Sequence, residues 1–367
     1  MSSIKQQTLE SAKWNFIDKI ATQGIQFLLG IVMARFLAPS DYGAVGMLAI
    51  FFAVSQTFID SGFSSALIRK KDTTEEDFST TFYFNFAISL VVYVILFLIA
   101  PWVSNFFNIP ILCPVLRVQS VTLILNAVMA VQVSMLNIRL DFKSLAKRNV
   151  TASVFSGVCG VVLAYLGYGI WALVIQQIIA AVVNLVFICV VCKWHPQAKF
   201  SRKSFKELGS FGIKLLFSGL LNTVYANLTT FAIGKFYTAK DLGFYTRGIQ
   251  FAHVPNSAIN GVLSTVTYPI LAKIQDEEER LIFVYRKYIR ITSLCIFIFS
   301  GLICALAKPI ILFTLTEKWA EAIVFLHIFA FSAMFEHIST INLNLLKVKG
   351  RSDLFLKLEI IKKFLVF

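Results

Sequence analysis

Residues 79–103 read STTFYFNFAISLVVYVILFLIAPWV and contain no charged side chain. A helix needs about 20 mostly apolar residues to cross the hydrocarbon core of a bilayer, so this stretch is long enough to span a membrane. Its apolar residues form a continuous run, whereas a membrane β-barrel strand alternates apolar and polar residues. Because backbone groups in lipid must be hydrogen-bonded within their own segment, this stretch is predicted to be a transmembrane helix.

Similar stretches cover nearly the whole chain. Hydrophobic residues make up 57% of the 367 residues, charged residues make up 15%, and the mean hydropathy is +0.74. A soluble domain is less apolar than this. Further spans are predicted at residues 14–37, 44–67, 115–137, 150–166, 170–192, 211–234, 244–270, 286–313 and 320–346, and an eleventh begins at residue 353. The predicted fold class is therefore an all-α integral membrane protein.

The basic residues occupy every second connection between the predicted spans. The formal net charge of +14 could by itself indicate a nucleic-acid partner. However, Lys and Arg that gather next to spans on one side of a membrane are the positive-inside signature. The connections rich in cations contain residues 5–13, 69–71, 139–148, 193–206, 273–287 and 347–357. This pattern predicts a multi-pass membrane protein with a cytoplasmic N-terminus and argues against a nucleic-acid partner.

The two halves of the chain share a spaced pattern. Arg35-Phe36, Asp41 and Gly43 follow the first span, and Lys235-Phe236, Asp241 and Gly243 follow the seventh, at an offset of 200 residues. Acidic triplets at residues 75–77 and 277–279 then follow the second span of each half. We therefore predict two homologous bundles, arranged as parallel repeats about an axis along the membrane normal.

The most polar connection places the boundary between these bundles. We predict a six-helix N-terminal bundle at residues 1–196, a cytoplasmic linker at 197–208, and a C-terminal bundle at 209–367. The second bundle would hold only about four to five spans of full length, so it is expected to be an incomplete, truncated copy of the first. Alternatively, the last segment is a terminal interfacial helix, because lysines interrupt its apolar run.

No enzyme or metal motif is present in the sequence. The histidines at 195, 253, 327 and 337 lack the close pairing of a metal site. There is also no glycine-rich phosphate loop and no nucleophile elbow. The chain is therefore expected to have no metal, no cofactor and no enzymatic activity. A membrane-embedded enzyme that modifies glycans remains the competing class.

Polar side chains inside spans are the candidate functional groups. A charged residue near the centre of a span costs about 2.5 to 3.5 kcal/mol on insertion scales, so it usually faces an aqueous cavity or a partner. The first two spans of each half hold the largest polar sets, namely Asp18, Lys19, Gln23, Gln26, Gln56, Asp60, Lys214, Asn222, Asn227, His253, Asn256 and Asn260. This placement predicts one central cavity between the bundles.

Two readings stay open for some of the charged residues. Asp18, Lys19 and Lys214 lie near span ends, where they could instead pair with each other or cap a helix. The loop at residues 69–77 carries both signs of charge and could form cytoplasmic gating ion pairs or remain solvated.

Several motifs along the chain point to one family. They are ARFLAPSDYG at 34–43, DSGF at 60–63, IRLDFK at 138–143, GYGIWAL at 167–173, LGFYTR at 242–247, YP at 268–269 and GRSD at 350–353. In this order they resemble the Wzx-type polysaccharide flippases. These are exporters of O-antigen and other lipid-linked oligosaccharides in the multidrug/oligosaccharidyl-lipid/polysaccharide exporter superfamily. The resemblance covers essentially the whole chain, although family members carry more spans.

The resemblance implies a function. The chain would export an undecaprenyl-pyrophosphate-linked oligosaccharide across the bacterial cytoplasmic membrane for surface polysaccharide or lipopolysaccharide biosynthesis. Two MATE-like bundles would do so by alternating access around a cationic cavity. The implied partners are the lipid-linked oligosaccharide, membrane lipids and the polysaccharide polymerase machinery. The competing function on the same fold is a cation-coupled small-molecule (multidrug) antiporter, which should bury more carboxylates than cations.

Under this reading, the polar residues within the spans have assigned roles. The candidate substrate-binding residues are Lys19, Lys214, Asn222, Asn227, Asn260 and His253. Asp18 and Asp60 are the candidates for ion coupling or gating.

Overall fold

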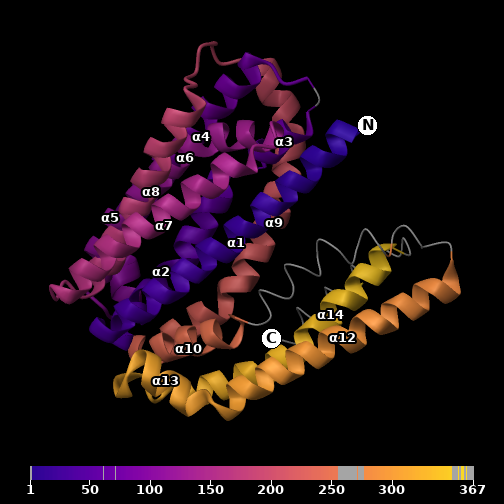
Figure 1. Cartoon of the computed structure of the whole chain (residues 1–367). Coiled ribbons are helices and arrows are strands. Elements are labelled where there is room, and N and C mark those ends of the chain that lie inside the picture. The colour runs from indigo at the N-terminus through magenta and orange to yellow at the C-terminus, as the bar shows by residue number, and fades with distance from the viewer. Residues whose placement is uncertain are drawn as a thin grey trace. The chain divides into compact units, whose positions relative to one another are not determined.

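A computed structural model of the chain describes residues 2–60, 62–70, 72–254, 271, 277–348, 354, 357–358 and 361 (Figure 1). These residues form two compact units, residues 1–243 and residues 244–367. Long helices dominate both units. Within the described residues, seven helical segments are long and apolar enough to cross a membrane.

The first unit contains nine helices and the beginning of a tenth. They are α1 (Ser2–Phe36), α2 (Pro39–Asp60), α3 (Phe63–Arg69), α4 (Glu75–Phe107), α5 (Leu112–Gln119), α6 (Val121–Ile138), α7 (Phe142–Tyr165), α8 (Ile170–Cys192), α9 (Arg202–Phe236) and the start of α10 (Ala239–Ala252). Helix α1 packs on α7, α7 on α8, α4 on α6, and α2 on α9. Helix α9 starts within the predicted linker at residues 197–208 and belongs to the first unit.

Helix boundaries in the first unit follow from local capping chemistry. Helix α4 starts with a capping box, in which Thr74 Oγ1 accepts a hydrogen bond from the Asp77 backbone N–H and the Asp77 carboxylate accepts one from the Thr74 N–H. Asp141 caps α7 by accepting from the Ser144 N–H, and Ser201 caps α9 by accepting from the Ser204 N–H. Such caps satisfy N–H groups that have no partner inside the helix.

The second predicted span, residues 44–67, is not one helix. Helix α2 ends at Asp60 and α3 starts at Phe63, and between them Gly62 adopts a φ of +72°. A side chain on residue 62 would be strained at this φ, and its Cβ would lie 2.5 Å from the Gly212 carbonyl oxygen of α9. Glycine therefore permits both the bend and the close approach of α9.

The distribution of polar residues in α4 is the reverse of that in a soluble protein. Val91, Leu98 and Trp102 are exposed, with 58%, 66% and 75% of their surface accessible. Asn85 and Ser89 on the same helix are fully buried. A helix that turns its apolar side chains outward is stable where the surroundings are hydrocarbon. The chain is a multi-pass membrane protein.

The second unit is built around a helix pair. It contains the remainder of α10, α12 (Glu278–Ala305), α13 (Ala307–Leu315), the short 3-10 helix η1 (Glu317–Trp319) and α14 (Ala322–Val348). Helices α12 and α14 pack side by side (Figure 1). The Ser293 hydroxyl of α12 lies 2.8 Å from Nε2 of His337, a fully buried residue of α14.

The ninth predicted span is also shorter than expected. The prediction covered residues 286–313, whereas α12 ends at Ala305 and α13 follows it. Pro309 has no N–H to donate to the carbonyl of residue 305, so the helix cannot continue regularly through this point. Most of the predicted eighth span beyond residue 254, and most of the segment after residue 348, lie outside the described residues.

Candidate functional site

Helix α9 lies along α2, and the two helices form a seam inside the first unit. The hydroxyl groups of Thr57 on α2 and Thr223 on α9 are 3.0 Å apart and share a hydrogen bond. At one end of the seam, the backbone of Gly212 approaches Gly62. Small residues and hydroxyl pairs of this kind allow close packing of membrane helices. The seam therefore brings together the two helices that carry most of the predicted polar residues of this unit.

Helices α2 and α10 touch at their N-terminal ends by a reciprocal contact. A Cβ built on Gly43 would lie 1.6 Å from the Ala239 carbonyl oxygen, and one built on Gly243 would lie 2.0 Å from the Pro39 carbonyl oxygen. Residues 39 and 239, and residues 43 and 243, are related by the offset of 200. Residue 43 therefore meets residue 239, and its counterpart 243 meets residue 39, the counterpart of 239. A twofold rotation produces such a reciprocal contact.

The orientation of the rotation axis relative to the membrane follows from the positions of the helix ends. Both α2 and α10 begin at the contact, so the rotation keeps equivalent helix ends on the same side of the membrane. An axis in the membrane plane would place them on opposite sides. The contact therefore fits the predicted parallel repeat. We call this end of the first unit the Gly43 end.

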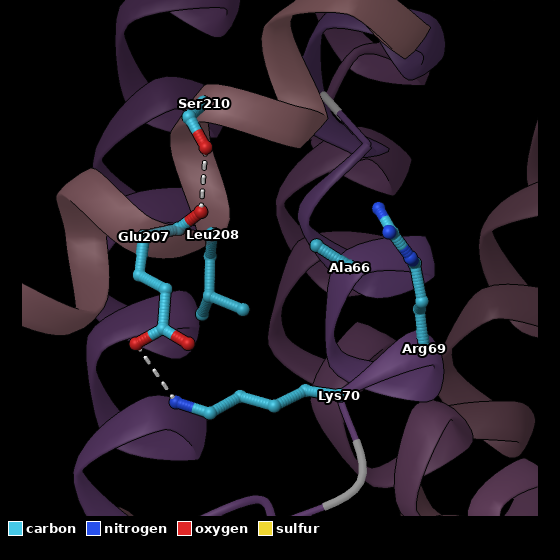
Figure 2. A pocket seen from close by; sticks show the side chains of 6 residues that line it. All are labelled: Ala66, Arg69, Lys70, Glu207, Leu208 and Ser210. Carbon is cyan, nitrogen blue, oxygen red and sulfur yellow. Dashed lines mark hydrogen bonds and ion pairs between the residues drawn. The ribbon is translucent and has the colours of Figure 1, made fainter.

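The end of the seam that lies opposite the Gly43 end holds a small polar pocket. We call this end the Lys70 end. The pocket has a volume of about 220 Å³ and is lined by Ala66, Arg69, Lys70, Glu207, Leu208 and Ser210. Figure 2 shows Lys70 extending from the end of α3 toward Glu207 on α9, while Arg69 leaves the backbone in another direction.

Lys70 joins two carboxylates from different helices. Its Nζ lies 2.9 Å from an Asp77 carboxylate oxygen and 3.1 Å from one of Glu207. Asp77 is fully buried, whereas about half of the Glu207 side chain is exposed. Partial burial disfavours the ammonium ion, but the two carboxylates outweigh this effect and raise the pKa of Lys70 above its ordinary value. For the loop at residues 69–77, the sequence left ion pairing and solvation both open. Lys70 and Asp77 of this loop form an ion pair.

A second polar group links α2 to α6. Gln56 Nε2 donates to an Asp60 carboxylate oxygen at 3.1 Å, and Asn126 Nδ2 donates to Gln56 Oε1 at 3.2 Å. The carboxylate of Asp60 is therefore part of a chain of three side chains.

Asp18 and Lys19 lie next to each other on α1 but have different surroundings. The Asp18 carboxylate accepts hydrogen bonds from Thr22 Oγ1 at 3.0 Å and from Asn149 Nδ2 of α7 at 2.9 Å. Lys19 is exposed. Asp18 thus bridges α1 and α7.

The structure does not gather all the predicted residues into one cluster. Asn222 is exposed on α9, and Asn227 donates to the Thr223 carbonyl oxygen at 2.8 Å. Lys214 lies on α9, but its side chain is outside the described part of the chain, as is Asn260 entirely. His253 belongs to the second unit, where its Nδ1 lies 3.4 Å from a Glu336 carboxylate oxygen.

The sequence interpretation missed a buried polar column on α4. Asp77, Thr81, Asn85 and Ser89 are all fully buried and recur every fourth residue, which places them on one side of the helix. Among the described residues, the side-chain oxygen and nitrogen of Asn85 have no hydrogen-bond partner, and the hydroxyl of Thr81 has none either. The spacing was visible in the sequence, but Thr, Ser and a single Asn hardly lower the hydropathy of an apolar run. Glu207 was missed because its partner lies 137 residues away.

Curated proteins similar to this chain include several from polysaccharide biosynthesis. The chain is 27% identical over 357 residues to the teichuronic acid biosynthesis protein TuaB of Bacillus subtilis, covering 96% of this chain and 74% of that protein. It is 24% identical to the lipopolysaccharide biosynthesis protein WzxC of Escherichia coli, covering 99% and 74%. It is 26% identical to the succinoglycan biosynthesis transport protein ExoT of Rhizobium meliloti, covering 84% and 63%.

Solved transporter structures share the fold. The lipid II flippase MurJ in an inward closed conformation superposes with a TM-score of 0.71 at 13% identity, covering 93% of this chain and 76% of that chain. An inward-facing multidrug resistance MATE transporter of the MOP superfamily superposes with a TM-score of 0.63 at 18% identity, covering 89% and 84%.

A protein-family model also matches the chain. The model described as "polysaccharide biosynthesis protein" matches residues 32–324, which is most of the chain. The matched region runs from the end of α1 to the beginning of α14 and includes the α2–α9 seam. The chain belongs to this family of polysaccharide biosynthesis proteins.

Proposed function

We propose that the protein translocates an undecaprenyl-pyrophosphate-linked oligosaccharide across the bacterial cytoplasmic membrane by alternating access. Membership in a polysaccharide biosynthesis family supports this proposal. So do relatives that are named for transport or lipopolysaccharide biosynthesis, and a fold shared with a lipid II flippase. The exported product would pass to polysaccharide polymerase machinery on the other side of the membrane.

The observation that carries the proposal is the hydrogen-bonding character of the α2–α9 seam at membrane depth. One polar group on the α2 side consists of Gln56, Asp60 and Asn126. Helix α9 carries Asn222 and Asn227. Amides both donate and accept hydrogen bonds, which suits the hydroxyl groups of sugars. In this reading Asn260 and His253 supply equivalent groups from the second bundle.

The pyrophosphate would be bound by cations. Lys19 is exposed on α1, and Lys214 is the matching candidate on α9. A charge-assisted hydrogen bond to a phosphate oxygen is about twice as strong as a neutral one. The lipid chain can remain in the bilayer during transport, because only the charged and polar head must cross.

The charge pattern of the loops sets the orientation that we propose. The Lys70 end of the first unit would face the cytoplasm, together with the N-terminus, and the Gly43 end would face outward. A cysteine at Ser201 should then react only with a reagent on the cytoplasmic side, and a cysteine at Ser40 only with a reagent outside. Reversed reactivity at both sites would refute the orientation.

Alternating access needs one contact that holds and one that opens. In our proposal the reciprocal contact at Gly43 and Gly243 is the pivot, because both repeats contribute equivalent residues to it, whereas the approach of Gly212 to Gly62 near the Lys70 end is not reciprocal. The ion pair between Lys70 and Glu207 is the contact that opens. A partly exposed ion pair contributes only about 0 to 1 kcal/mol, so it can break and re-form during a transport cycle.

Asp18 and Asp60 are the proposed sites of ion coupling. Moving one elementary charge through the membrane potential releases about 2.3 kcal/mol per 100 mV, which is enough to bias a conformational equilibrium. The carboxylate of Asp60 lies in the hydrogen-bonded chain with Gln56 and Asn126. Protonation of Asp60 would therefore alter the contacts between α2 and α6.

Export of the lipid-linked sugar in cells tests the proposed substrate. Lys19→Ala and Lys214→Ala should reduce export by about one to two decades at normal protein abundance, because each removes a charged partner of the phosphate. Arg at either position should restore more export than Gln does. Lys13→Ala removes an exposed cation from the same helix as Lys19 and should leave export unchanged.

Two outcomes would contradict the assignment. Normal export in the double alanine variant would remove both lysines from substrate binding. Extrusion of a cationic dye without sugar export would favour the multidrug antiporter instead.

A further inference from the structure

A large apolar groove lies on the first unit, between α2 and α4, with Phe231 of α9 at one end. Its volume is about 710 Å³. The wall includes Phe51 and Phe58 of α2 and residues from Phe84 to Ile99 of α4. Ser55, which is buried, is the one polar residue among those that line it.

The groove faces hydrocarbon when the protein is in its membrane. Val91, in the middle of the groove, has 58% of its surface exposed, and Phe58 at its rim has 38%. A bilayer core offers no water to fill an apolar groove at this depth. Its occupant is therefore either a hydrocarbon chain or another helix.

The dimensions of the groove decide between these two occupants. Along α4 the groove runs from Phe84 to Ile99, which is about 22 Å at a rise of 1.5 Å per residue. Even the whole empty space of the groove with its open mouth, about 1400 Å³, gives a mean cross-section of only about 60 Å² over this length. A helix with its side chains is about 10 to 12 Å wide and would need roughly 80 to 110 Å². The groove cannot take in a whole helix, whereas a single hydrocarbon chain fits within it.

The length of the groove also indicates which kind of chain it takes. Phe84 lies nine residues after the start of α4 and Ile99 lies eight residues before its end, so the groove is centred on this span. One leaflet of the hydrocarbon core is about 15 Å thick, half of the full 30 Å. A groove of about 22 Å centred on the membrane therefore extends into both leaflets. An acyl chain of a phospholipid stays in one leaflet, whereas a long polyprenyl chain can cross the midplane.

The groove adjoins the polar seam that we assign to the head of the substrate. Phe58 at its rim follows Thr57, which bonds Thr223 of α9. On α9, Thr223, Asn227 and Phe231 recur every fourth residue and so share one side of the helix. A lipid with its chain in the groove would have its head beside Thr223 and Asn227.

We propose that this groove binds the polyprenyl chain of the transported lipid. This inference rests on the proposed function and adds the place where the lipid chain binds. The groove would guide the chain along α4 while the head group enters the seam between α2 and α9. It would also select carriers whose chain is long enough to fill it across the midplane.

A pair of adjacent substitutions on α4 tests the proposal. Val91→Trp places an indole in the middle of the groove. Leu90→Trp adds the same side chain at a neighbouring residue that is 40% exposed and does not line the groove. Both variants remain apolar on a lipid-facing helix, so both are expected to insert and fold. The probes are undecaprenyl phosphate, farnesyl phosphate and phosphatidylglycerol, whose binding to the purified full chain is measured in detergent micelles.

We expect Val91→Trp to weaken binding of undecaprenyl phosphate at least tenfold, and Leu90→Trp to leave it within twofold. Farnesyl phosphate, with only three isoprene units, should bind the wild type more weakly and be less affected by Val91→Trp. A photoreactive amino acid at Ile88 or Ile95 should crosslink to the undecaprenyl chain.

The possible failures are distinguishable. If the wild type binds undecaprenyl phosphate and Val91→Trp binds it equally well, the groove is not the chain site, while the proposed function stands. If phosphatidylglycerol competes as effectively as undecaprenyl phosphate, the groove holds an ordinary membrane lipid and the inference is overturned. If the wild type binds no polyprenyl phosphate, the groove has no affinity for the chain and the inference is overturned, whereas the proposed function is decided by export of the lipid-linked sugar.

Discussion

The acidic loops of the two repeats share a sequence pattern but differ in structure. In the first loop, Asp77 is fully buried, caps α4 and pairs with Lys70, which also reaches Glu207 on α9. In the second loop, Glu277 pairs with Arg280 of the same segment, and both side chains are more than half exposed. Among the described residues, Asp77 thus makes an interhelical contact in the first loop, and Glu277 makes a local surface pair in the second.

At the Gly43 end the two repeats are equivalent. The Asp41 carboxylate accepts from the Ala38 N–H at 2.9 Å, and the Asp241 carboxylate accepts from the Thr238 N–H at 3.0 Å. The glycines that follow make the reciprocal contact. Within the described residues, the repeats are therefore alike where backbones meet and differ in the ion pairs that their acidic loops make.

The largest effect is expected where the repeats are equivalent. Gly43→Ala and Gly243→Ala should each destabilise the protein by about 3 kcal/mol, because the added methyl group would overlap a backbone carbonyl that cannot rotate away. Thermal unfolding of the purified variants measures the loss. In Gly24→Ala of α1, the new methyl group meets no atom within 4 Å. That control should be neutral or more stable by up to about 1 kcal/mol, since alanine favours a helix. Unequal losses at residues 43 and 243 would break the equivalence.

A smaller effect is expected where the repeats differ. Asp77→Ala should lower stability by about 2 kcal/mol, because it removes the carboxylate of the α4 capping box and the buried partner of Lys70. Glu277→Ala should change stability by less than about 0.5 kcal/mol, as expected for an exposed pair. The two melting curves, recorded under the same conditions, provide the check. Equal losses would mean that the second loop is as integrated into the fold as the first.

The smallest effect concerns the pair between Lys70 and Glu207. Glu207→Gln should cost less than about 1 kcal/mol of stability and should favour the open Lys70 end. Faster labelling of a cysteine at Ser210 would report that opening. Since the pKa of Lys70 is raised, the stability it contributes is fully present below its ordinary pKa of 10.5 and is lost only as the pH rises through the higher folded value. Labelling normalised to the thiolate fraction of the cysteine at each pH should therefore be constant from about pH 6 to 9, and acceleration of the normalised rate within that range would implicate another group.

The sequence predicted most of the long helices that the structure describes, but neither the breaks within two predicted spans nor the long-range contacts. The apolar run at 79–103 predicted α4, since a charge-free run of that length has one stable form in lipid. The bend at Gly62 could not be predicted, because it depends on Gly212 from a distant helix. The partner of Lys70 could not be chosen either, since several acidic residues were available and only packing brings Glu207 close. The offset of 200 did predict a repeat, because backbone contacts between glycines constrain both sequences at once.

The most direct test of the central claim is a flipping measurement on the purified protein in vesicles. A fluorescent undecaprenyl-pyrophosphate oligosaccharide is placed in both leaflets, and a quencher that cannot cross the membrane is added outside. We predict that the protein makes the protected inner pool accessible to the quencher, and that Lys19→Ala slows this at least tenfold while Lys13→Ala does not. An inner pool that stays protected in vesicles containing folded wild-type protein would contradict the account.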